Sequence, residues 1–90
     1  MSELYQKIKG QQVRVPCSVD LFADSDGNKR GKTVPAGVYE CNYVNPGHSA
    51  PIHIKEIGRG DLGWIKCKPT SQILLSNPPV YVLESQFASV

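Results

Sequence analysis

The chain has no long apolar run and no apolar leader, and these two absences exclude the commonest ways of entering a membrane. Its apolar runs extend over only a few residues, whereas a membrane-spanning helix needs about 20. The N-terminal stretch Met-Ser-Glu-Leu-Tyr-Gln-Lys-Ile-Lys-Gly lacks the apolar segment of a secretory signal peptide. We therefore expect no membrane insertion, no signal peptide and synthesis in the cytoplasm.

An excess of charge of one sign is also missing, and cysteine is scarce. Ten basic and eight acidic residues give a net charge of +2, which is too mild for the clustered basic face of a nucleic-acid-binding protein. The three cysteines, Cys17, Cys41 and Cys67, cannot all pair internally, and none is spaced as Cys-x-x-Cys. We interpret them as three reduced thiols, with one bridge plus one free thiol as the alternative.

What the sequence does contain favours one small β domain. Ninety residues suffice for a single domain, which buries roughly 60% of its unfolded surface. Eight glycines and seven prolines indicate many turns between short elements. An N-terminal extension, residues 1–12, has Leu4, Tyr5 and Ile8 on one side of a short helix, which Gly10 ends.

Alternation of apolar and polar residues predicts a series of short strands. We predict extended segments over residues 13–15, 19–22, 37–44, 52–57, 62–67 and 80–83. In the third of these we place Tyr39, Cys41 and Tyr43 toward the core. The opposite choice stays open, because Val38 and Val44 lie on the other face.

Three local features resemble the bacterial SH3 family, and together they span residues 13–69. Residues 34–37, Val-Pro-Ala-Gly, stand before a strand, like the entry to the second core strand of that family. Residues 63–65, Gly-Trp-Ile, resemble the family's Gly-Trp-aliphatic signature. The order of a first strand, a long polar loop, two strands, a short turn and a Gly-Trp strand is similar as well.

The resemblance implies an all-β fold, namely a small SH3-like barrel of five to six short strands with a short N-terminal helical turn. Residues 13–69 would form the barrel, after the N-terminal extension of residues 1–12. Residues 70–90 would be a C-terminal extension that contributes one extra closing or edge strand.

The same resemblance implies a ligand groove lined by aromatic side chains, between the long loop and its neighbour. Phe22 stands at the start of the long loop, and Tyr43 precedes the loop of residues 45–51. Trp64 belongs to the Gly-Trp signature, so these three residues are the candidate ligand-binding side chains. Packing in the core is the alternative for each of them.

Members of the family are non-catalytic recognition modules that typically tether a hydrolase, often phage-encoded, to peptidoglycan. A module of this type, with a cell-wall peptide or a partner protein as ligand, is our leading hypothesis, and its final location would be a virion or the cell wall. One alternative is a small phage, prophage or bacterial assembly subunit that forms a homo-oligomer through the C-terminal strand. Another is a polyanion binder that uses Lys29, Arg30 and Lys32, which otherwise form a solvated loop.

Metal-binding and catalytic patterns are missing. In the turn Asp-Ser-Asp-Gly-Asn, aligning Gly27 with the sixth position of an EF-hand loop puts Phe22 first and Thr33 twelfth, where carboxylates are needed. His48, His53 and the cysteines lack the short spacing of a structural zinc site. No segment resembles a known nucleophile turn. We expect no metal, no cofactor and no enzymatic activity.

Overall fold

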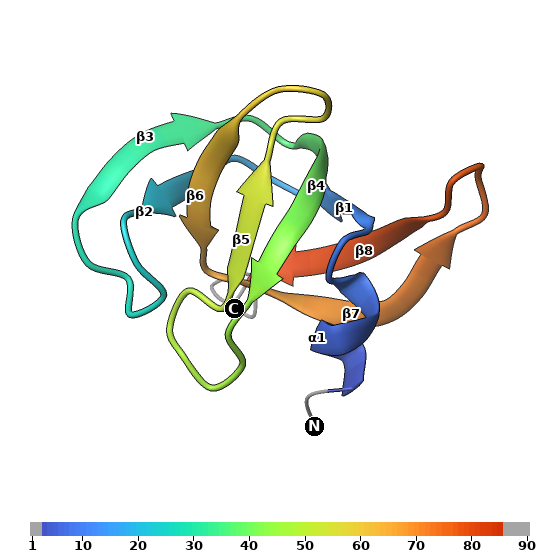
Figure 1. Cartoon of the computed structure of the whole chain (residues 1–90), viewed down its shortest axis with the longest axis horizontal. Helices are drawn as coiled ribbons and strands as arrows, with labels where there is room; N and C mark the ends of the chain where they lie inside the picture. The colour runs from blue at the N-terminus through green and yellow to red at the C-terminus, as the bar shows by residue number, and fades with distance from the viewer. Residues whose placement is uncertain (1–2, 86–90) are drawn as a thin grey trace.

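The structure is a computed structural model that describes residues 3–85. This part of the chain contains one short helix and eight strands (Figure 1). In chain order they are α1 (Glu3–Ile8), β1 (Gln12–Val15), β2 (Val19–Phe22), β3 (Arg30–Val34), β4 (Gly37–Val44), β5 (Ile52–Lys55), β6 (Asp61–Ile65), β7 (Cys67–Leu74) and β8 (Val80–Ser85). The prediction of a mostly β chain with a short N-terminal helix is confirmed. Among these residues, no helix has the length and apolar character that crossing a membrane requires.

The eight strands belong to one sheet, in the order β3-β2-β6-β5-β4-β1-β8-β7. β1 and β8 run parallel, and all other neighbouring pairs are antiparallel. The consecutive strands β4, β5 and β6 form a meander in the middle of the sheet. β3 and β7 lie at the two ends of this order without pairing to each other, so the sheet is not closed into a barrel.

The structure contains two strands that the sequence does not predict, β3 and β7. Both segments have residues that disfavour a strand, but each pairs with a neighbouring strand. β3, Arg-Gly-Lys-Thr-Val, has the polar composition of a loop, but it is an edge strand. Its Thr33 lies opposite Asp20 of β2, and the Thr33 hydroxyl donates a 2.6 Å hydrogen bond to the Asp20 carboxylate. In β7, Pro69 predicts a break, but a register shift between Pro69 and Ile73 accommodates it.

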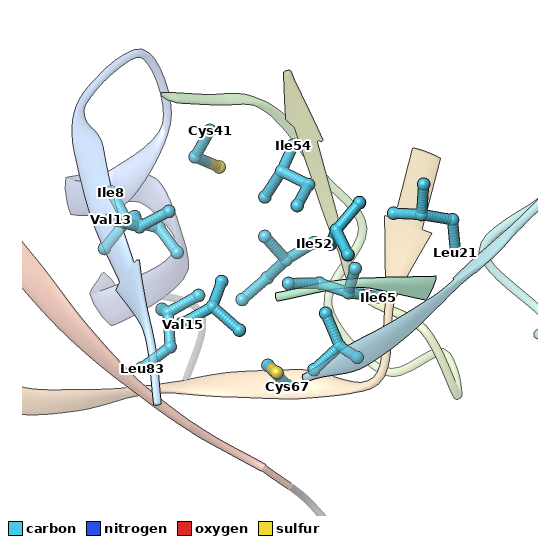
Figure 2. Packing of buried hydrophobic residues seen from close by; sticks show 12 residues of the cluster. Ile8, Val13, Val15, Leu21, Cys41, Ile52, Ile54, Ile65, Cys67 and Leu83 are labelled. Atoms are coloured by element: carbon cyan, nitrogen blue, oxygen red, sulfur yellow. The ribbon is translucent and has the colours of Figure 1, made fainter. Parts of the chain in front are cut away.

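The core is one cluster to which the helix and every strand contribute (Figure 2). Its buried members are Ile8, Val13, Val15, Val19, Leu21, Val34, Cys41, Ile52, Ile54, Ile65, Cys67 and Leu83. Burying a Val, Leu or Ile side chain completely is worth about 1.5–3 kcal/mol. Since α1 has six residues and is too short to be stable alone, it depends on packing, which Ile8, 1% exposed, and the partly buried Tyr5 supply.

Along β4, the alternation of inward-facing and outward-facing residues shifts by one position after Asn42. Cys41 is fully buried and Tyr39 packs against the core, as predicted, but Tyr43 is 53% exposed, so its predicted inward orientation is wrong. The pairing with β5 shifts register between Cys41 and Tyr43, which leaves Asn42 as an extra residue. After this β-bulge Tyr43 points outward, and Val44 packs against the core instead.

Gly63 lies where β6 passes close to β2, and a side chain has little room there. A Cβ at this position would be 3.2 Å from the Leu21 Cβ and 3.2 Å from the backbone oxygen of Phe22. We expect Gly63→Ala to lower the free energy of unfolding by about 1–3 kcal/mol, since an extra methyl group must push paired strands apart. Urea denaturation measures this loss. Gly60→Ala is the matched control, because nothing lies within 4 Å of its added Cβ; equal losses in both variants would contradict the explanation.

The three cysteines are free thiols, and their exposure predicts an order of reactivity. Cys17 is exposed, whereas Cys41 and Cys67 are fully buried, and burial raises the pKa of both buried thiols to about 12. We expect a thiol reagent at neutral pH to label Cys17 quickly in the native protein, and Cys41 and Cys67 only after unfolding. Mass spectrometry after timed labelling gives the three rates. Rapid labelling of either buried thiol in the native state would contradict its enclosure in the core.

Candidate functional site

Four ring side chains lie in a row across four neighbouring strands. Phe22 of β2 is paired with Trp64 of β6, and His53 of β5 lies between Trp64 and Tyr43 of β4. The His53 ring meets both neighbours edge-on, with ring centroids 5.1 Å apart for Trp64 and 5.4 Å apart for Tyr43. We name Phe22, Trp64, His53 and Tyr43 the aromatic row. The structure thus brings the three aromatic residues predicted from the sequence into one line.

The aromatic row faces outward because alternation along each strand turns the flanking residues inward. In β5, Ile52 and Ile54 are fully buried on either side of His53. In β6, the buried residues Gly63 and Ile65 flank Trp64 in the same way. None of the four rings belongs to the buried cluster: Tyr43 is exposed, and Phe22, His53 and Trp64 are half-buried.

A chain of polar contacts holds His53 in one orientation. Its Nδ1 lies 2.6 Å from Asn42 Oδ1, and Asn42 Nδ2 donates a 2.7 Å hydrogen bond to Asp61 Oδ1. Since the Asn42 nitrogen is the donor to Asp61, the Asn42 oxygen accepts from His53 Nδ1, which therefore carries the ring proton. In the neutral ring, Nε2 is then a hydrogen-bond acceptor. Burial lowers the pKa of His53 below its usual value, although the negative charge of Asp61 acts to raise it.

Beyond Phe22 the aromatic row adjoins a hollow of about 360 Å³. Its lining consists of Ser18, Val19, Asp20, Phe22, Arg30, Lys66 and Ser85. The Lys66 ammonium nitrogen lies 4.6 Å from the centroid of the Phe22 ring, as in a cation–π contact. Arg30 Nη1 lies 3.7 Å from Asp20 Oδ2. This end of the row therefore combines an aromatic wall with charged groups of both signs.

The turn that follows Phe22 is closed by its own side chains. Asp24 Oδ1 accepts hydrogen bonds from the backbone N–H groups of Asp26 and Asn28, each at 3.1 Å. Asp24 Oδ2 accepts a further bond from Asn28 Nδ2 at 3.2 Å. The backbone hydrogen bond from Asn28 is the main reason that the pKa of Asp24 is lowered. Both carboxylate oxygens thus serve the turn itself.

This turn is also bonded to the loop that joins β4 to β5. Asp26 Oδ1 lies 2.8 Å from His48 Nδ1, and Asn45 Nδ2 donates a 2.8 Å hydrogen bond to Ser25 Oγ. The backbone N–H of Ala50 donates to the Ser25 carbonyl oxygen at 2.8 Å. Because the two loops follow the strands that carry Phe22 and Tyr43, these bonds fix the ends of β2 and β4 relative to each other.

The three basic residues predicted as an anion site do not gather in one hollow. Arg30 lines the 360 Å³ hollow beside Phe22 and is paired with Asp20. Lys29 and Lys32 instead line a different hollow of about 200 Å³. The side chains of all three are exposed.

His53 and Lys66 belong to this face, but neither is among the ligand-binding residues predicted from the sequence. Alternation marks both as outward-facing, His53 between two isoleucines and Lys66 two residues after Trp64. That signal does not show which residues lie beside them. Only the strand order β2-β6-β5-β4 places His53 between Trp64 and Tyr43.

Comparison with known proteins identifies no relative for this face. No protein-family model matches the sequence, and neither a curated protein nor a solved structure matches the chain. Within residues 3–85, no group of three or more His, Cys, Asp or Glu side chains is placed to hold a metal ion. The role proposed for the aromatic row therefore rests on its geometry and on the sequence motifs described above.

The lowered pKa of His53 predicts a pH dependence of stability. In the unfolded chain His53 titrates near its usual pKa of about 6.5, so between that value and its folded pKa the unfolded state binds more protons. The free energy of unfolding should therefore fall as the pH drops through this window. Urea denaturation at several pH values measures it. In His53→Gln this part of the fall should disappear, and the same pH dependence in both proteins would contradict the assignment.

Proposed function

We propose that the chain is a non-catalytic binding module of the bacterial SH3 type, which holds an extended peptide of the bacterial cell wall against the aromatic row. The observation that carries the proposal is the row itself, in which four rings come from paired positions of four neighbouring strands and His53 contacts the rings on both sides of it. Rigid aromatic rings bury a large area at small entropic cost, and grooves lined with them are typical of modules that bind extended peptides.

The family resemblance supports the same proposal. The Val-Pro-Ala-Gly entry joins β3 to β4, and the Gly-Trp-Ile signature lies in β6, so the two motifs lie at the start and in the last strand of the β4–β5–β6 meander. This meander carries three of the four rings of the aromatic row. Modules of the family typically bind peptidoglycan, and this is why we propose a cell-wall peptide rather than an arbitrary one.

The dimensions of the aromatic row suit a short peptide. The row crosses four neighbouring strands, and three inter-strand steps of about 4.8 Å give a length of about 14 Å. An extended peptide advances about 3.3 Å per residue, so about four residues would lie along the row. A short peptide therefore suffices to cover all four rings.

Polar groups beside the rings give the ligand a direction. His53 Nε2 offers a hydrogen-bond acceptor to a peptide N–H in the middle of the row. At the Phe22 end, Arg30 and Lys66 offer positive charge to a carboxylate, next to the negative charge of Asp20. In such an interface the rings supply most of the contact area, and the polar groups select the orientation.

Binding to purified cell walls tests the proposal. The protein is incubated with sacculi from Gram-positive and Gram-negative bacteria, and the bound fraction is measured after pelleting. We expect the wild-type protein to pellet with walls of at least one source. Tyr43→Ala removes the ring at one end of the row, and Trp64→Ala removes a ring from its middle. Each variant should weaken binding by about tenfold or more.

Val38→Ala is the matched control, since Val38 is 42% exposed on the same strand as Tyr43 but lies outside the aromatic row. It should bind walls as the wild-type protein does. Circular dichroism establishes that each variant is folded. The proposal fails if the wild-type protein pellets with no sacculi, or if folded Tyr43→Ala and Trp64→Ala bind as tightly as Val38→Ala.

A further inference from the structure

The hairpin of β7 and β8 ends the sheet at a strand edge that carries little charge, and α1 packs against β7. β7 is the last strand of the sheet, bonded to β8 on one side and to no other strand of residues 3–85. The turn end of the hairpin projects away from the rest of the sheet (Figure 1). Residues 69–83 contain no Asp, Glu, Lys or Arg, although 20% of the chain is charged. Charged side chains normally protect an exposed edge from pairing. β7 carries only Lys68, its second residue, so the part of the edge after Lys68 is suited to pairing.

The opposite edge of the sheet is protected in the usual way. β3 contains Arg30 and Lys32, and Lys29 directly precedes it. Two copies that met through this edge would bring like charges together, which disfavours the contact. β7 carries fewer basic residues than β3, so repulsion between like charges opposes strand pairing less at the β7 edge.

Exposed aliphatic side chains gather on the same hairpin. Ile73 is 43% exposed, Leu74 is 42% exposed, and Leu75, in the turn after β7, is 96% exposed. Between α1 and the hairpin lies a hollow of about 80 Å³, lined by Leu4, Lys7, Ile8, Thr70, Ser71, Ile73 and Tyr81. An open backbone edge, aliphatic side chains and a largely apolar hollow occur together, so the surface fits an uncharged strand with aliphatic side chains.

We propose that this strand is the β7 of a second copy of the chain, and that the two copies pair edge to edge in a twofold-symmetric dimer. A twofold axis relates the two β7 strands in antiparallel fashion, so each copy donates and accepts the same backbone hydrogen bonds. The second copy supplies both things that the surface fits, a strand with no charge after Lys68 and aliphatic side chains such as Leu75. Pairing through the part of β7 after Lys68 brings no like charges together, because residues 69–83 carry none.

The same geometry limits the assembly to two copies. Pairing occupies the β7 edge of both, and the edges that remain are the basic β3 strands. The aromatic row lies on β2, β6, β5 and β4, which β1 and β8 separate from β7 in the sheet order. Each copy therefore keeps its aromatic row open, and a polymer with repeated peptides would engage two rows with increased avidity.

Sedimentation equilibrium of the full chain over a wide range of concentrations tests the dimer. We expect the mass to approach twice the 9.9 kDa of one chain as concentration rises. Leu75→Lys should weaken the dimer about tenfold or more, because it removes an apolar contact and places a charge in both copies of the interface. Leu75 is almost fully exposed in the single copy, so the fold should persist, which circular dichroism checks.

Ile57→Lys is the matched control, because Ile57 is a 44% exposed aliphatic residue in the turn between β5 and β6. It adds the same charge outside the hairpin and should leave the dimer unchanged. A monomer at every concentration would overturn the proposal, and so would a dimer that persists equally in Leu75→Lys and Leu74→Lys. Binding of a monomeric protein to phosphatidylcholine–phosphatidylglycerol vesicles, lost in Leu75→Lys, would also overturn it, since the hairpin would then serve a lipid surface. None of these outcomes depends on binding to cell walls.

Discussion

Burial of one apolar cluster is the constraint on which the rest of this small protein depends. A 90-residue chain buries a limited fraction of its surface, and here the helix and each of the eight strands contribute at least one buried side chain. Cys41 and Cys67 belong to this cluster as small apolar residues rather than as a disulfide. Within residues 3–85, no buried side-chain nitrogen or oxygen lacks a hydrogen-bond partner, so the cluster is closed without polar defects.

The aromatic row lies on the opposite face of the strands whose inward-facing residues form that cluster. Because strand residues alternate, the burial of the isoleucines of β5 and β6 turns His53 and Trp64 outward. The bulge at Asn42 then adds Tyr43, which regular alternation would have turned to the same side as buried Cys41. Asn42 also bonds to His53, so one irregular residue both extends the row and orients its central ring.

The position of the basic residues 29–32 at one edge of the sheet gives them a structural explanation. If these residues formed a loop, they would suggest an anion-binding site. As the protected edge of a sheet, it has a role that needs no ligand, because its charges discourage pairing with another strand. β7 carries a single basic residue, Lys68, so the two edges of the open sheet differ in charge.

Local features follow from the sequence alone, because glycine, proline and the alternation of apolar and polar residues predict short strands and a short helix. Tertiary structure decided the rest. The orientation of Tyr43 depends on a bulge that exists only in the pairing of β4 with β5. The polar segment β3 is a strand because it lies at an edge, where only one side needs a partner. The aromatic row depends on strand order, because Phe22, Tyr43 and Trp64 are far apart in the chain and become neighbours only when long-range pairing aligns their strands.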